Sequence, residues 1–159
     1  MMQAWRIATD TRSYAADDMS GGGAKNTGGR WNSAGNPLVY ASSTRALACL
    51  ETMVHLGGGG LPLNRYLVRI DIPDDVWDAR QELELGAVPV GWDALPQGMT
   101  SLNIGDAWLV GAATAILLVP SIVVPEEQNI LINPAHQDAQ SITATKVRKW
   151  LYDARMLKT

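Results

Sequence analysis

The sequence has one cysteine, two histidines and no long apolar run, and each of these shortages excludes a class of protein. Cys49 has no partner for a disulfide, which favours a reducing compartment, so we expect a cytoplasmic protein. Cys49, His55 and His136 do not have the spacing of a zinc site, so we expect no metal. The longest apolar run, near residues 112–119, contains Thr114 and is shorter than the about 18 residues that a membrane helix requires.

The sequence also lacks an excess of positive charge, a secretory signal and the common nucleotide-binding motifs. The formal net charge is -3 at pH 7 and the isoelectric point is about 5.3, so the overall field does not favour nucleic acid. The first ten residues lack the charged-then-apolar layout of a secretory signal. Neither the P-loop pattern nor the Rossmann pattern occurs in the glycine-rich stretches 21–35 and 57–60, and the second stretch is interpreted as a plain linker. We therefore expect no membrane segment, no direct DNA binding and no nucleotide site of these two kinds.

Length and apolar periodicity predict one domain over residues 1–159. A chain of this size buries about 68–70% of its unfolded surface, enough for a core without disulfides. The expected class is α+β, a mixed β-sheet with flanking helices. A helix capped by Ser42 or Ser43 is predicted to run to about Leu56, and one capped by Thr100 or Ser101 to cover 104–113. The predicted strands are 4–8, 38–41, 64–72, 115–119, 122–124, 129–132 and 141–153, with a short helix near 76–84 and a loop over 11–27. In the strand 64–72 the residues alternate, which predicts Tyr66, Val68, Ile70 and Ile72 on one face.

A glycine-rich loop presents one arginine. Gly28 and Gly29 precede Arg30, and Trp31 and Asn32 follow it. Glycines have no Cβ, so they accept a left-handed backbone and let a ligand approach the chain closely. An arginine taken alone is more often a surface residue. In this setting its guanidinium is suited to a bidentate grip on phosphate.

An aromatic ring, an acid and a serine add to this arginine. Tyr40 lies on the short strand that follows, where a tyrosine alone is more often part of the core. In the next helix Glu51 lies about 40° beyond Leu47, which predicts a half-buried carboxylate at the edge of an apolar stripe. Ser121 follows Pro120. A proline at that point implies an edge, a bulge or a bend of the strand, which changes the direction of the Ser121 side chain. The combination indicates a site. The stripe comprises Ala46, Leu47, Cys49, Leu50, Met53 and Val54.

Five segments also carry a family resemblance. They are GAKNTGGRWNSAGNPLVYASSTRALACLETMVHL (23–56), NRYLVRIDIP (64–73), GDAWL (105–109), LLVPSIVVPEEQNILINPAH (117–136) and YDARML (152–157). In this order they resemble the RES-domain toxins of bacterial toxin–antitoxin pairs, a family named for an arginine, a glutamate and a serine.

This resemblance implies the fold, the site and the partners. It implies a split mixed sheet similar to that of ADP-ribosyltransferases, with NAD as the substrate and no cofactor. The implied partner is an Xre-like helix-turn-helix antitoxin that blocks the cleft, so we expect a hetero-oligomer in which the antitoxin binds DNA. The implied catalytic residues are Arg30, Glu51 and Ser121, and the implied substrate-binding residues are Arg30, Tyr40, Asn133, Gly29 and Trp31.

Cleavage of the nicotinamide–ribose bond of NAD fits these residues. Nicotinamide leaves as a neutral molecule, so no general acid is needed, and Glu51 would stabilise the positive charge that develops on the ribose. We expect Arg30 to hold the pyrophosphate or ribose, Tyr40 to stack on nicotinamide and Ser121 to bond nicotinamide or its ribose. The first hypothesis is NAD degradation by a glycohydrolase or phosphorylase. Two alternatives stay open: a protein mono-ADP-ribosyltransferase, and an inactive module that binds a nucleotide or the antitoxin.

Overall fold

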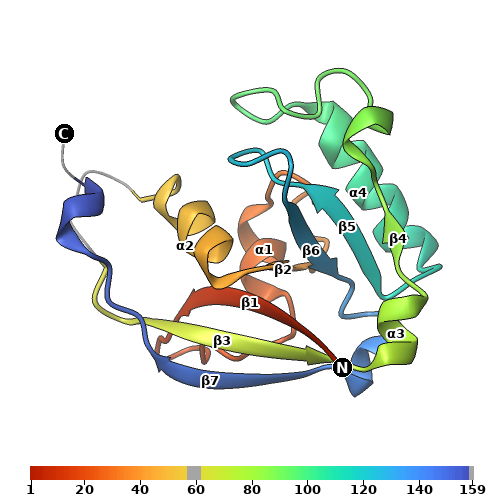
Figure 1. Cartoon of the computed structure of the whole chain (residues 1–159). Helices are drawn as coiled ribbons and strands as arrows, with labels where there is room; N and C mark the ends of the chain where they lie inside the picture. Colours follow the sequence, from red (N-terminus) through yellow and green to blue (C-terminus); the bar gives the residue numbers. More distant parts are fainter. Residues whose placement is uncertain (57–61, 158–159) are drawn as a thin grey trace.

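The computed structural model describes residues 1–56 and 62–157, so the predicted linker at 57–60 lies outside the described residues. Within these ranges no helix is long and apolar enough to span a bilayer. The strands, labelled as in Figure 1, are β1 (Met2–Thr9), β2 (Val39–Ser42), β3 (Arg65–Ile72), β4 (Gln81–Glu82), β5 (Ile116–Pro120), β6 (Gln128–Ile132) and β7 (Thr143–Lys149). The helices are α1 (Gly22–Thr27), α2 (Arg45–Met53), α3 (Asp74–Asp78) and α4 (Met99–Gly111), with short 3-10 helices at Leu85–Ala87, Gln137–Ser141 and Ala154–Leu157.

The strands form one mixed sheet that divides into two halves. Its order is β4-β5-β6-β2-β1-β3-β7, with β4 and β5 parallel and the other neighbours antiparallel. β1 pairs with β3 along its whole length but with β2 only through Trp5 opposite Ser42. Figure 1 shows that β1, β3 and β7 consequently run in a different direction from β5 and β6. The predicted α+β class with a split mixed sheet is confirmed.

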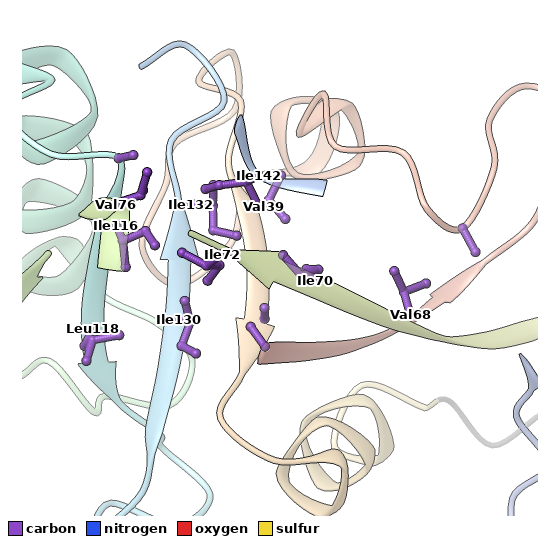
Figure 2. Packing of buried hydrophobic residues seen from close by; sticks show 14 residues of the cluster. Val39, Val68, Ile70, Ile72, Val76, Ile116, Leu118, Ile130, Ile132 and Ile142 are labelled. Atoms are coloured by element: carbon purple, nitrogen blue, oxygen red, sulfur yellow. The ribbon is translucent and has the colours of Figure 1, made fainter. Parts of the chain in front are cut away.

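The main core fills the angle between these two halves. On β3 the alternate residues Val68, Ile70 and Ile72 are buried, as the alternation predicted. Figure 2 shows Ile70 and Ile72 near Val39 of β2 and Ile130 of β6, and all of these residues belong with Val68 to one buried cluster. Successive side chains of a strand point to opposite faces, so the other face of β2 and β6 is turned away from this core. That face carries the polar residues of the site.

Two predicted segments have a different structure. The predicted loop 11–27 contains α1, although its glycines are poor helix formers. The helix is stabilised by residues that follow it, because the Asn32 side-chain amide donates to the carbonyl of Ala24 and the Gly35 N–H donates to the carbonyl of Lys25. The predicted run 122–124 forms a turn instead of a strand. The N–H groups of Val123 and Val124 in this run bind the side-chain oxygen of Ser121.

The helix boundaries also need correction. Thr44, and neither Ser42 nor Ser43, caps α2 by accepting a hydrogen bond from the Leu47 N–H. α4 begins after Gly98 instead of at a Thr100 or Ser101 cap, and the helix predicted near 76–84 is the shorter α3, followed by β4. The apolar stripe of α2 is narrower than predicted because α2 packs on β1 through one face only. Leu47, Ala48 and Cys49 are buried, whereas Ala46, Leu50 and Val54 are exposed.

Candidate functional site

Glu51 is the centre of a hydrogen-bonded group between α2 and the ends of β5 and β6. It is half-buried, as its position on the helix predicted. Its Oε1 accepts hydrogen bonds from Ser121 Oγ at 2.6 Å and from Asn129 Nδ2 at 2.8 Å. Within the described residues its other oxygen, Oε2, has no hydrogen-bond partner. One edge of the carboxylate is fixed by the protein, and the other is available to a ligand.

Ser121 is fully buried and its hydroxyl is committed to the protein. It follows Pro120 at the end of β5, as predicted. Its Oγ accepts the N–H groups of Val123 and Val124, both at 3.1 Å, which closes the turn that replaces the predicted strand. The single hydroxyl proton is then donated to Glu51. Ser121 therefore contributes to the site by holding the Glu51 carboxylate, and its hydroxyl has no further proton to donate to a ligand.

Asn129 is a member of this group to which the sequence analysis gave no role. The strand 129–132 was predicted, without a place for Asn129 in the site. Ile130 and Ile132 face the core, so alternation turns Asn129 toward the opposite face of β6. An amide at the start of an apolar strand, on the face shared with Tyr40 of the neighbouring strand, was the signal that could have identified it.

Arg30 is held by a distant loop. Its Nη1 donates to the carbonyl oxygens of Trp92 at 2.9 Å and Ala94 at 3.0 Å. Partial burial lowers the pKa of Arg30, and the negative charges of Asp93 and Glu51 oppose that shift. Glu51 therefore acts electrostatically on this guanidinium. The remaining N–H groups of Arg30 have no hydrogen-bond partner within 1–56 and 62–157, so they can donate to an anion.

Tyr40 and Trp31 shape the loop that carries Arg30. The Tyr40 hydroxyl accepts the Trp31 N–H at 3.0 Å and donates to Asn32 Oδ1 at 2.7 Å, and burial raises its pKa well above the ordinary value. A Cβ on Gly29 would lie 2.6 Å from that hydroxyl, so only glycine fits there. The Trp31 ring is buried and stacks on Trp92 with centroids 6.3 Å apart.

Helix α4 holds the same loop from the other side. A Cβ on Gly105 would lie 1.7 Å from the Trp31 carbonyl oxygen, so the helix touches the loop backbone directly. Asp106, the next residue, accepts hydrogen bonds at 2.9 Å from the Ser33 N–H and from Asn36 Nδ2. The Ser33 hydroxyl also donates to Asp106 Oδ2. Partial burial raises the pKa of Asp106, but the hydrogen bonds from the Ser33 hydroxyl, the Ser33 N–H and Asn36 together outweigh that effect and lower the pKa below its ordinary value. Neither Gly105 nor Asp106 was predicted to contribute to the site.

The structure joins most of the predicted site residues but not all. Ser121 contacts Glu51, and Arg30 lies within electrostatic reach of it. Asn133 follows the far end of β6, four residues from Asn129 and so about 13 Å along the strand. It is buried, donates to the Leu109 carbonyl oxygen and accepts the Ala135 N–H. These contacts connect β6 to α4 and do not bring Asn133 to the carboxylate.

Comparisons with known proteins identify the family to which these residues belong. The family model described as "RES domain" matches residues 3–154. The chain is 62% identical over 154 residues to "Prs ADP-ribosylating toxin" of Sphingobium sp. (strain YBL2), covering 97% of this chain and 96% of that protein. It is 36% identical to "Toxin Res" of Photorhabdus laumondii (93% and 94% covered) and 34% identical to "Toxin Res" of Yersinia enterocolitica (98% and 99% covered).

Proposed function

The chain belongs to the RES domain family, whose fold is similar to that of ADP-ribosyltransferases, and we propose that it is a toxin that cleaves the nicotinamide–ribose bond of NAD. In this proposal the ADP-ribose then passes to an acceptor. The observation that carries the proposal is the Glu51 carboxylate, fixed through Oε1 by two donors and lying within electrostatic reach of Arg30.

Glu51 would act on the charge that develops as the bond breaks. Nicotinamide departs as a neutral molecule, so the transition state has positive charge on the ribose and resembles an oxocarbenium ion. The available Oε2 of Glu51 would stabilise this charge directly, or by accepting a hydrogen bond from a ribose hydroxyl. Such a contact lowers the barrier only if it strengthens in the transition state, and a carboxylate facing a developing cation satisfies that condition.

Arg30 would hold the anionic part of NAD. Its Nη1 is held by two carbonyl oxygens, which fixes the plane of the guanidinium without neutralising its charge. The remaining N–H groups would bind the pyrophosphate. In this proposal the half-buried ring of Tyr40 faces the nicotinamide, Gly29 and Trp31 shape the loop, and Ser121 acts through Glu51.

We favour a protein as the acceptor of ADP-ribose. The support is the name of the Sphingobium relative, which gives Prs as the molecule that the relative modifies. The second candidate is NAD degradation, the first hypothesis of the sequence analysis. It is supported by the composition of the hydrogen-bonded group. Of its described members Glu51, Ser121 and Asn129, Glu51 alone has a carboxylate. Inorganic phosphate is already anionic and attacks without a general base, so one carboxylate is sufficient for that reaction.

Product analysis distinguishes these acceptors. Purified chain is incubated with NAD labelled in the adenylate part, alone, with inorganic phosphate, and with purified Prs. The expected result is release of nicotinamide together with label attached to Prs. Label recovered as free ADP-ribose or its phosphate, with no labelled protein, would show NAD degradation. NAD that stays intact under all three conditions would contradict the proposed reaction and favour an inactive binding module.

We further propose that the chain pairs with an Xre-like helix-turn-helix antitoxin. The resemblance implies this partner, and α2 exposes an apolar row beside Glu51 that a partner could cover. Leu50 is 38% exposed and Val54 is 57% exposed on that row. Co-expression with such an antitoxin is expected to give a stable complex in which nicotinamide release is suppressed. Co-purification without suppression would place the antitoxin away from Glu51.

A further inference from the structure

Ser42 and Asn129 form a polar pair across two neighbouring strands. They lie opposite each other where β2 and β6 pair, on the face turned away from the main core. Ser42 Oγ donates to Asn129 Oδ1 at 2.8 Å. The two strands are already joined by backbone hydrogen bonds from Val39 to Ser42, so the sheet does not need this side-chain contact to form.

The pair gives the Asn129 amide a defined orientation. An asparagine side chain has an oxygen that accepts and a nitrogen that donates. Because the oxygen accepts the Ser42 hydroxyl, the nitrogen is turned toward Glu51 and donates to Oε1 at 2.8 Å. The Ser121 hydroxyl also has a defined orientation, because its oxygen accepts two backbone N–H groups and its proton is donated to Glu51. The two donors, Ser121 Oγ and Asn129 Nδ2, are therefore both directed at Glu51 Oε1.

We propose that Asn129, oriented by Ser42, is a positioning residue that fixes the Glu51 carboxylate for the reaction. Asn129 and Ser121 bind the same oxygen, so together they set both the position and the rotation of the carboxylate and leave Oε2 for the ligand. This inference rests on the proposed function, because it requires Glu51 to act in the transition state. Asn129 itself acts through Glu51 and is not assigned a contact with NAD.

Burial separates a positioning role from a purely structural one. Asn129 is only half-buried, so water can replace its hydrogen bond when the side chain is removed. Loss of the amide should therefore cost little stability. A carboxylate held by Ser121 alone can rotate, however, and each conformation in which Oε2 points elsewhere lowers the turnover rate.

The test is a steady-state comparison of nicotinamide release by wild type, Asn129→Ala, Asn129→Asp and Ser42→Ala. Removing a hydrogen bond to a charged group should lower kcat about 10- to 100-fold in Asn129→Ala. Asn129→Asp should lose at least as much, because it places a second negative charge against Glu51. Ser42→Ala should lower kcat by less, about 3- to 10-fold, since it frees the amide without removing it. The KM for NAD should stay within about twofold in the alanine variants.

A double-mutant cycle tests whether Asn129 acts through the carboxylate. In a Glu51→Gln background, Asn129→Ala should cause no further loss, because the negative charge that Asn129 positions is already absent. Asn103→Ala, an exposed asparagine on α4, is the matched control and should leave kcat and KM unchanged. Thermal unfolding of every variant shows whether a loss of activity reflects loss of fold, and Ser42→Ala keeps the test open if Asn129→Ala does not fold.

The outcomes separate this inference from the function on which it rests. An active wild type with normal kcat in folded Asn129→Ala would overturn the inference alone. A loss that is equally large in the Glu51→Gln background would do the same, because it would show an action independent of the carboxylate. A wild-type chain that releases no nicotinamide from NAD would overturn the proposed function, and this inference with it.

Discussion

Arg30 and Glu51 are held in place in different ways. Arg30 is fixed by backbone carbonyl oxygens of a loop that lies 62 and 64 residues further along the chain. Glu51 is fixed by side chains, Ser121 and Asn129, at the ends of two strands. A carbonyl is present whatever residue occupies the position, whereas a hydroxyl or an amide depends on residue type. The Glu51 side of the site is therefore sensitive to substitution of its neighbours, and the Arg30 side is sensitive to movement of its loop.

The two sides also differ in the source of their rigidity. The Glu51 group rests on regular elements, with Ser121 directly after β5, Asn129 on β6 and the acid on α2. The Arg30 loop takes its shape from contacts with α4 and Tyr40, among which Gly105 and Asp106 touch the loop directly. The comparison suggests a division of work in which Glu51 determines the rate of bond cleavage and Arg30 determines the affinity for NAD.

Substitution of the acid should have the largest effect. Glu51→Gln keeps the shape of the side chain but removes its charge, and kcat for nicotinamide release should fall about 100- to 1,000-fold, as for other preorganised contacts of this kind. Thermal unfolding should stay close to that of the wild type. Glu84→Gln, at an exposed glutamate, is the control. Equal activity of Glu51→Gln and wild type would remove Glu51 from the mechanism.

Substitution of the guanidinium should affect affinity more than rate. Arg30→Ala should raise the KM for NAD about 10- to 100-fold because charge-assisted hydrogen bonds to phosphate are lost. Arg30→Lys retains the charge without the planar fork and should have an intermediate KM. Arg12→Ala, at an exposed arginine, should change neither constant. A fall in kcat with unchanged KM would contradict the division between the two sides.

Tyr40→Phe separates the hydroxyl from the ring. Loss of the hydroxyl leaves the Trp31 N–H and Asn32 Oδ1 without their partner, and should lower the free energy of unfolding in urea by about 1–3 kcal/mol. The ring remains, so the KM should rise much less in Tyr40→Phe than in Tyr40→Ala. Tyr14→Phe, at an exposed tyrosine, is the stability control. If both Tyr40 variants have the same KM, the ring does not contribute to binding.

The parts of the fold that the sequence predicted are those governed by local periodicity. The alternation of β3 predicted its buried face, and the helical position of Glu51 predicted a half-buried acid. The error in the α2 stripe has the same origin, because periodicity shows where apolar residues gather but not which of them a neighbouring element covers. Leu50 and Val54 face away from β1 and remain exposed.

The parts that the sequence did not predict depend on contacts between distant segments. The carbonyl oxygens that hold Arg30 have no residue-type signal, and their position depends on the path of the 92–94 loop. Asp106 is ordinary in sequence and gains its role only when α4 lies against residues 33–36. Asn129 had a local signal, its alternation with Ile130, but that signal could not identify Glu51 as the partner.

The smallest effect is expected at Asp106, which tests the rigidity of the Arg30 side. Asp106→Asn weakens the bonds from Ser33 and Asn36, and should lower the free energy of unfolding at pH 7 by about 1–2 kcal/mol. The KM for NAD should rise about two- to fivefold as the loop loosens, with little change in kcat. Asp78→Asn, at an exposed aspartate, is the control for loss of charge.

The pH dependence of this variant identifies the cause. The pKa of Asp106 is lowered by folding, so its charged form stabilises the folded chain at pH values above the ordinary carboxyl pKa. That stabilisation is lost as the pH falls through the lowered pKa, which lies below the ordinary value of 3.8. In urea unfolding from pH 7 downward, the stability difference between wild type and Asp106→Asn should hold to about pH 4 and then shrink. A difference that does not change with pH would show that the carboxylate charge does not hold the Arg30 loop.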